Sequence, residues 1–277
     1  MSLPIFMENF ISACLIIRDE AGLLERCLES LKKAADEIII IHDGECKDKS
    51  LEIARRFKAR IFERPERGYM EAHLPFAFRE ARGNWILRID ADEYLSPELA
   101  DSLRSLAAAD FSAYSFFWPL WDGKKEITSR WPEKTCFFKK SAVSFIAVPH
   151  AYIRVAGKTA KSSFTLRHRP DYDNLSLAVF KNKWLKWAGL QAKIYLKDFS
   201  EIEKFNCQDM DWPLKIMIRK KFSILLLPVE FILVFADSLL DGGLKEGWVG
   251  VKTAFFRGLY RAAVNCRIFA EKRRLKK

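Results

Sequence analysis

The chain has 277 residues, which is enough for one large domain or two modest ones with a sizeable buried core. Its 49 % hydrophobic and 30 % charged residues exclude a disordered chain, and its six scattered cysteines favour reduced cytosolic thiols over a disulfide framework or a zinc site. The net charge of +11 indicates attraction to polyanions, with nucleic acid, anionic lipid headgroups and phosphorylated substrates as candidates.

The first hundred residues predict alternating strands and helices. The opening MSLPIFMENF lacks the basic and apolar regions of a signal peptide, so none is expected. Short apolar runs and helical spacings then predict, in chain order, strand 11–17, helix 24–31, strand 37–43, helix 51–57, strand 60–63, helix 70–82, strand 84–90 and a helix capped by Ser96. This alternation is typical of an α/β fold with a mostly parallel sheet and helices on both faces.

The pattern changes in the second half of the chain. Short segments with prolines and aromatic residues between 113 and 166 predict a mixed or antiparallel extension of the sheet. From 175 onward the spacing predicts helices. We therefore expect one α/β domain over 1–174, made of two halves that meet near 107, and a helical C-terminal region over 175–277.

Acidic side chains follow three of the predicted strands. Parallel α/β sheets bind ligands beyond the carboxyl ends of their strands, so these acids are expected to share one edge. Mutual repulsion between them would be offset by a divalent cation with oxygen ligands, Mn²⁺ or Mg²⁺. An Asp-x-Asp sequence is also common on surface turns, but here it follows an apolar strand and precedes a capped helix. The acids are Asp19, Glu20, Asp43, Asp48, Asp90, Asp92 and Glu93.

Three segments that contain these acids resemble the motifs of family 2 glycosyltransferases. They are LIIRDEAGLLERCLESL, IIIIHDGECKDKSLEIA and NWILRIDADEYLSPEL, which together cover roughly Ile11 to Leu106 in the right order and spacing. The chain is most similar to the lipopolysaccharide core β-glucosyltransferase type, whose C-terminal part carries an LDGxxG sequence like that from Leu240 to Gly243.

The resemblance implies a GT-A-type fold, with a nucleotide-binding half at 8–107 and an acceptor half at 108–174. It implies metal-dependent, inverting transfer of a hexose from a nucleoside-diphosphate sugar, expected to be a UDP-sugar, to a glycan or glycolipid such as lipopolysaccharide. Asp43 matches the acid that contacts the nucleoside, while Asp90 and Asp92 match the metal-binding pair. The substrate-binding candidates are Arg18, Glu20, Asp43, Asp48, Arg67, His73 and Asp90.

Two departures from the family pattern leave roles open. Residues 72–75 replace the usual Ala-Arg-Asn before the fourth strand, so Arg64, Arg67 and His73 are alternatives for supporting the phosphates. Ala151 stands where a glutamate is common, which leaves the general base unassigned. The candidates are His150, Asp171, Asp173 and Glu133; Asp173 equally fits a helix cap, and His150 equally fits a core histidine.

The tail carries most of the net charge. Segment 222–240 is strongly apolar but contains Glu230 and Asp237, and a carboxylate at the bilayer centre costs roughly 2.5–3.5 kcal/mol. A core helix or an in-plane helix is therefore favoured over a spanning one. Residues 243–277 mix aromatics with ten Lys or Arg and two Glu. We expect peripheral attachment to the anionic inner face of the cytoplasmic membrane, with a helix packed on the domain as the alternative.

Two other functions stay open at this stage. A nucleotidyltransferase would show a glycine-rich, basic loop after the first strand, and residues 18–22 do not resemble one. A non-catalytic protein that binds membranes or polyanions would explain Ala151. Nucleic acid is not an expected partner, because the acids at the strand ends repel phosphates.

Overall fold

The computed structural model describes residues 9–151, 153–207 and 212–275. Most of the stretch in which no signal peptide is expected therefore lies outside the described residues.

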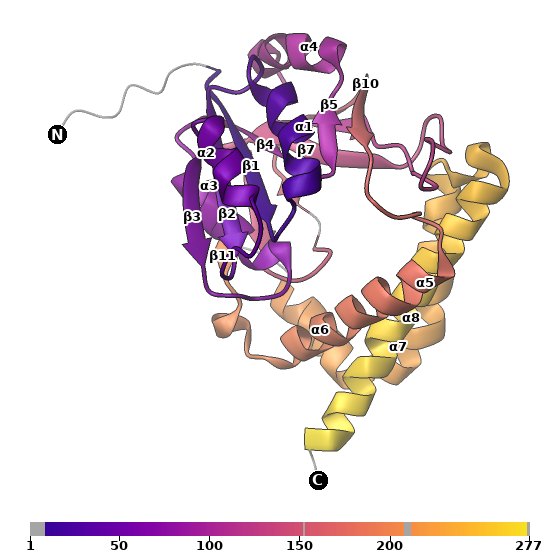
Figure 1. Ribbon diagram of the computed structural model, residues 1–277. Coiled ribbons are helices and arrows are strands. Elements are labelled where there is room, and N and C mark those ends of the chain that lie inside the picture. The colour runs from indigo at the N-terminus through magenta and orange to yellow at the C-terminus, as the bar shows by residue number, and fades with distance from the viewer. Residues whose placement is uncertain (1–8, 152, 208–211, 276–277) are drawn as a thin grey trace.

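The core of the molecule is an eight-stranded, mostly parallel sheet (Figure 1) with the order β3-β2-β1-β4-β7-β6-β10-β5. The first four strands of that order are parallel to one another, and β7 runs antiparallel to both β4 and β6. The strands are β1 Ile11–Ile17, β2 Glu37–Asp43, β3 Arg60–Arg64, β4 Trp85–Arg88, β5 Glu93–Leu95, β6 Ala113–Phe117, β7 Glu133–Lys139 and β10 Thr159–His168.

Helices cover both faces of this sheet, as the sequence predicts. One hydrophobic core lies beneath α1 (Ala21–Leu31), α2 (Ser50–Arg56) and α4 (Pro97–Ala108), and a second lies beneath α3 (Leu74–Glu80). The Ser96 hydroxyl caps α4 by accepting a hydrogen bond from the Leu99 amide at 3.3 Å. The helix expected over 70–82 is divided into the 3₁₀ turn η1 (Met70–Ala72) and α3, with Pro75 in the first turn of α3.

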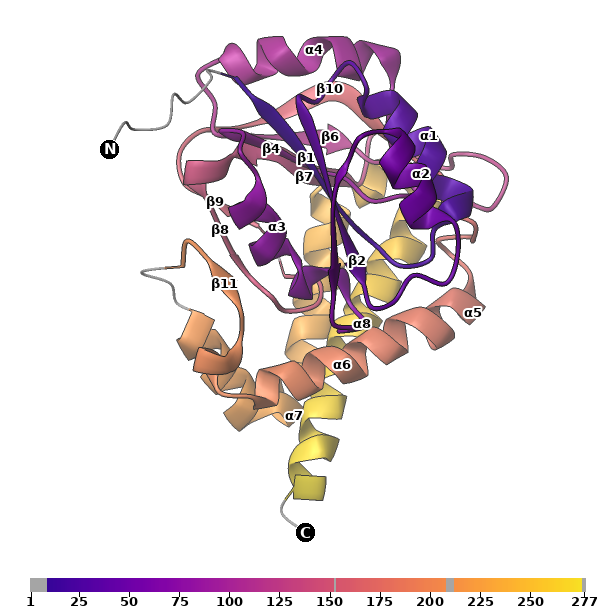
Figure 2. The same ribbon diagram turned by 60° about the vertical axis from the view of Figure 1, so that its left-hand side comes forward.

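The C-terminal region is helical, with one exception. It contains α5 (Leu177–Val179), the π-helical turn η3 (Phe180–Trp184), α6 (Leu185–Leu196), the 3₁₀ turn η4 (Phe199–Glu201), α7 (Trp212–Leu240), the 3₁₀ turn η5 (Gly243–Glu246) and α8 (Gly247–Leu275). The exception is β11 (Lys204–Phe205), which forms a small sheet with β8 (Val143–Ile146) and β9 (Arg154–Val155). Strand β8 follows the 3₁₀ turn η2 (Lys140–Ala142) in the chain. Figure 2 shows α6 crossing below the large sheet, with α7 and α8 beyond it.

Candidate active site

The carboxyl ends of β1, β2 and β4 meet at one edge of the sheet. These strands are adjacent and parallel, with Ile17 beside His42 and Cys14 beside Arg88 in the register. The arrows of β2 and β3 point toward the level of α6 (Figure 1), so this edge faces the C-terminal helices. The turns after the three strands therefore deliver their side chains to one region, as the sequence predicts.

A lysine that the sequence did not single out neutralises two acids of the Asp-x-Asp-Glu segment. The Nζ of Lys134, on β7, lies 2.6 Å from Asp90 Oδ2 and 2.6 Å and 2.7 Å from the two carboxylate oxygens of Glu93. Burial would raise the pKa of Asp90, but Lys134 and then Arg88 outweigh it and hold that pKa below its usual range. Burial raises the pKa of Glu93 to about 7, against the opposing effect of Lys134.

Asp92 faces a histidine instead of a lysine. Its Oδ2 lies 3.4 Å from Nε2 of His168, the last residue of β10. The His168 Nδ1 lies 3.3 Å from the Pro119 carbonyl oxygen, which can only accept, so Nδ1 donates to it. The Trp118 ring stacks on the imidazole at 3.8 Å and holds it in place. The Nε2 atom of His168 is therefore directed at Asp92, and both side chains have little exposure.

Glu20 belongs to the same group of acids. Burial and the nearby Asp92 raise the pKa of Glu20 to about 8, with a smaller contribution from Asp90. Burial and then Asp92 also raise the pKa of Tyr172 well above its ordinary value, and Lys183 Nζ lies 3.6 Å from the centre of the Tyr172 ring. The ends of β1 and β4 therefore converge as expected. Oxygens of Asp90, Asp92 and Glu93 all lie within 4.8 Å of one another.

Asp43 organises the loop that follows β3. Its buried carboxylate accepts hydrogen bonds from the amides of Arg67 at 2.6 Å and Gly68 at 2.8 Å, and from His73 Nε2 at 2.7 Å. A carboxylate has about four acceptor positions, so one remains for a ligand. His73 is consequently committed to Asp43, and Arg67 lines a separate cavity together with Tyr69.

The other candidates after β1 and β2 act within the loops. Asp48 accepts from the amides of Ala21 at 2.9 Å and Ser50 at 2.8 Å, so it caps α1 and α2, and these bonds lower its pKa despite an opposing burial effect. Arg18 forms an exposed ion pair with Glu66 at 2.6 Å. Neither geometry tests a role in substrate binding.

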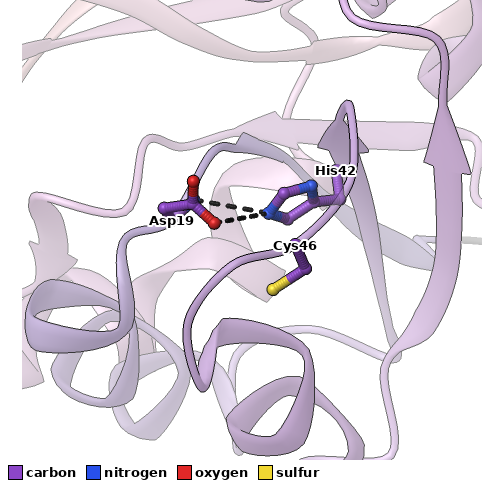
Figure 3. A group of neighbouring side chains, drawn as sticks. All are labelled: Asp19, His42 and Cys46. Carbon is purple, nitrogen blue, oxygen red and sulfur yellow. Dashed lines mark hydrogen bonds and ion pairs between the residues drawn. The ribbon is translucent and has the colours of Figure 1, made fainter.

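Asp19, His42 and Cys46 form a mixed group at the ends of β1 and β2 (Figure 3), and their ligand atoms lie within 4.8 Å of one another. The Asp19 amide donates to His42 Nε2 at 3.3 Å, and His42 Nδ1 donates to the Gly44 carbonyl at 2.9 Å. Asp19 Oδ1 also accepts from the Lys47 amide at 2.7 Å. These bonds join the loops after β1 and β2. We interpret the group as a brace between the loops.

His150 lies on the other side of the edge, in a cavity of about 360 Å³ between the loop after β8 and helices α6, α7 and α8. The residue is solvent-exposed, yet the rings of Trp187 and Tyr260 pack against it at 5.1 Å and 5.0 Å. Crowding by protein lowers the His150 pKa below its usual value, with Glu71 opposing, so the imidazole is neutral near pH 7. The buried Glu71 accepts a hydrogen bond from the His150 amide at 2.9 Å.

The two remaining base candidates differ in their surroundings. Asp173 accepts from the Leu175 amide at 2.7 Å in the loop before α5, whose N-cap residue is Ser176, so Asp173 does not cap that helix, which is the alternative that the sequence offers. Asp171 is exposed and lies close enough to Tyr172 to raise the pKa of that phenol.

Sequence reasoning missed three residues: Lys134, His168 and Glu71. His168 belongs to a polar run after a strand, which is a weak signal, and Lys134 had none because it pairs with Asp90 across 44 positions of the chain. The sequence predicts Glu71 within a helix. Nothing in the sequence places that helix against the loop of His150 and Ala151, so its contact with the His150 amide could not be foreseen.

The structure is an α/β fold with acidic residues at the carboxyl ends of its parallel strands, and sequence comparison gives the family. The family model "Glycosyl transferase family 2" matches residues 12–185. This match spans more than half of the chain, so the protein belongs to glycosyl transferase family 2. The GT-A-type fold expected for the family is confirmed by the strand order and the covering helices.

Individual relatives match a smaller part. An uncharacterized glycosyltransferase of Rickettsia bellii is 40 % identical over 99 residues, and the lipopolysaccharide core biosynthesis glycosyltransferase LpsC of Rhizobium meliloti is 33 % identical over 103 residues. Each alignment covers 36 % of this chain, with 33 % and 37 % of the respective relatives. The chain thus matches only about a third of the length of these relatives.

Among solved structures, a mannosyltransferase of Pyrobaculum calidifontis in complex with GDP-Man and Mn²⁺ superposes with a TM-score of 0.49 and 12 % identity, covering 95 % of this chain and 87 % of that one. TarS of S. aureus in complex with UDP-GlcNAc gives 0.44 and 11 % identity, covering 97 % and 92 %.

Proposed function

We propose that the protein is an inverting, metal-dependent hexosyltransferase that moves a sugar from a nucleoside-diphosphate donor, a UDP-sugar, to a glycan or glycolipid of the cell envelope. Membership of family 2 supplies the reaction class. The observation that carries the donor and metal assignment is the cluster of Asp90, Asp92 and Glu93, whose carboxylate oxygens lie within 4.8 Å of one another, with His168 Nε2 3.4 Å from Asp92.

The residues at this position fit Mn²⁺ or Mg²⁺. Asp92 offers a carboxylate oxygen and His168 its Nε2 atom, and imidazole together with carboxylate favours Mn²⁺ over Mg²⁺. A bound cation supplies charge stabilisation for the departing diphosphate. Asp90, already neutralised by Lys134, is left to accept hydrogen bonds from the donor, as Asp43 does with its remaining acceptor position.

Glu20 is proposed to favour the binding of a cation or of a hydroxyl donor at this site. A carboxyl group with a pKa of about 8 is mostly protonated near pH 7 when no counter-charge is present. A cation beside Asp92 would favour its ionised form, and a sugar hydroxyl could then donate to it. Lys183, which lies over Tyr172 close to these acids, is placed to contact phosphate oxygens.

His150 is the general base of this proposal. It is neutral near pH 7, open to solvent and positioned by Glu71, so it can take the proton of an acceptor hydroxyl that enters the cavity. Glu71 supplies the carboxylate that Ala151 does not. Asp171 and Asp173 remain the alternatives.

The acceptor and location are part of the proposal. The similarity to LpsC supports an acceptor of the lipopolysaccharide core type, over a short part of both chains. The basic C-terminal region supports a peripheral position on the anionic inner face of the cytoplasmic membrane.

A thermal-shift screen tests the donor and metal assignment. Nucleoside diphosphates and their sugars are added to the protein with and without Mn²⁺, and one nucleotide is expected to raise the melting temperature only when Mn²⁺ is present. The Asp92→Asn variant should lose this shift. A metal-independent shift of equal size in both proteins would refute the assignment.

A further inference from the structure

Helix α7 turns its apolar side chains outward. The stripe formed by Phe222, Leu225, Val229, Ile232 and Leu233, here called the outer stripe, has exposed fractions of 41 % to 66 %. Helix α7 bends at Phe222, whose backbone angles are not helical, and from there on spacings of three and four residues place the stripe along one face. Within the segment Leu214–Leu240, the most apolar window of 18 residues has a mean hydropathy of 2.1 and is only 11 % buried, so the helix is long and apolar enough to cross a membrane.

Several polar side chains of α7 are buried or bond to neighbouring helices, whereas Lys221 and Asp237 are exposed. Ser223 and Ser238 are buried, and Glu230 accepts a hydrogen bond from the buried Asn265 of α8 at 2.9 Å. Arg219 pairs with the same glutamate at 3.0 Å through Nε. A helix packed for water shows the opposite polarity, so the medium against the outer stripe is apolar.

Both ends of α7 are bonded to the catalytic domain or to helices that pack on it. Near the start, Arg219 donates to the Tyr195 hydroxyl at 2.9 Å and Lys220 to the Lys197 carbonyl at 2.6 Å, both at the end of α6. Just beyond the end, Asp241 accepts from Trp131 Nε1 at 3.3 Å.

The loop before β7 is held further by the 3₁₀ turn after α7. The amides of Ser129 and Trp131 donate to Glu246 at 2.9 Å and 3.0 Å. A spanning helix would put its two ends on opposite sides of a hydrocarbon layer about 30 Å thick. The two ends of α7 contact the same polar part of the protein, so α7 does not span such a layer.

The flanks of the stripe carry the groups that suit an anionic interface. At one end the exposed Lys221 lies near the last turn of α8, because Lys272 Nζ bonds to the Lys220 carbonyl. At the other end Trp248 is 77 % exposed and Leu244 59 % exposed. Lysines and a tryptophan beside an apolar stripe match the headgroup region of a bilayer.

We infer that α7 lies in the plane of an anionic bilayer, with its outer stripe at the boundary between headgroups and acyl chains and the catalytic domain on one side of it. This inference rests on the proposed membrane location and extends it, because it fixes which surface meets the lipid. It also brings the His150 cavity, whose wall includes Ile218 and Leu226 of α7, next to the bilayer. A lipid-borne acceptor can then enter the site without leaving the membrane.

Vesicle flotation tests the inference with the full chain and a double variant, Leu225→Asp with Ile232→Asp. The wild type should float with phosphatidylcholine vesicles that contain phosphatidylglycerol. It should bind vesicles of phosphatidylcholine alone more weakly. Each substitution removes about one buried leucine-sized side chain from the lipid, so the double variant should bind about 100-fold more weakly. The control Leu177→Asp alters a leucine of α5 that is 55 % exposed and should bind as the wild type does.

Three further readouts decide between the occupants of the stripe. Alkaline carbonate should release the native protein from membranes, and retention would overturn the in-plane placement in favour of a spanning helix. Equal flotation of the double variant and the wild type would overturn the choice of surface. If the wild type is a dimer that does not bind vesicles, and the double variant is a monomer, the stripe contacts a second copy of the chain instead of lipid. The nucleotide-dependent thermal shift is measured on each variant, so a failure of the donor assignment is seen separately.

Discussion

Substitution of Lys134 by methionine tests how the acidic edge is held together. Methionine keeps most of the apolar stem but removes the ammonium that lies 2.6 Å from both Asp90 and Glu93. The lysine side chain is 16 % exposed and that of Glu93 is fully buried, so water cannot replace the lost charge. Breaking a buried pair in this way costs about 3–5 kcal/mol, a large part of the roughly 5–15 kcal/mol that stabilises a folded domain.

The loss should depend on pH. Glu93 has a pKa of about 7 with the lysine present, and removal of Lys134 raises it further, so the variant can escape part of the cost by taking up a proton. The destabilisation is therefore smaller at about pH 6 than at about pH 8.5.

Urea unfolding followed by circular dichroism measures the effect. With an m value of about 3 kcal/mol per molar urea, the midpoint should fall by about 1–1.7 M at the higher pH. The control Lys158→Met removes an ion pair whose side chains are 71 % and 88 % exposed, and it should cost less than about 1 kcal/mol. If the two variants unfold at the same urea concentration, the buried pair does not stabilise the site and the reasoning is wrong.

Four other predictions address the site. Asp92→Asn and His168→Ala should each weaken Mn²⁺ binding by about tenfold or more, measured by calorimetry. His150→Gln should lower kcat by about 10²–10⁴-fold without changing the donor Kd, measured by steady-state kinetics and nucleotide titration. Asp43→Asn should raise the donor Kd, because Arg67 and Gly68 lose a charged acceptor. The stability of the metal-free protein should fall as pH rises from about 4.5 to about 8, because the folded state favours protonated Glu20; Glu20→Gln should reduce this slope in thermal melts.

Each of these predictions has an outcome that contradicts it. Unchanged Mn²⁺ affinity in both the Asp92 and the His168 variant would move the metal elsewhere. A His150 variant with normal kcat would return the base to Asp171 or Asp173. A donor Kd unaffected by Asp43→Asn would limit that residue to bracing its loop. A pH slope that survives Glu20→Gln would place the raised pKa on another acid.

The sequence by itself determined the local elements and the family. The apolar runs at 11–17, 37–43 and 84–90 correspond to β1, β2 and β4. A parallel strand that is buried on both faces is a continuous apolar run, so its own sequence is enough to predict it. The acids after them share one edge because parallel neighbours end on the same side. Ser96 caps α4 because a cap involves only the next three residues.

Contacts between distant segments were decided by the tertiary structure alone. Lys134 and His168 reach the acids from β7 and β10, and the pairing of those strands depends on a register that side-chain alternation leaves undetermined. The two residues of β11 interrupt a region expected to be helical, because they pair with β8. The apolar composition of α7 was plain in the sequence, but only packing against α8 decided that Ser223, Glu230 and Ser238 face its neighbours and that the apolar stripe faces outward. Periodicity defines the faces of a helix, and the neighbours it meets decide which face is covered.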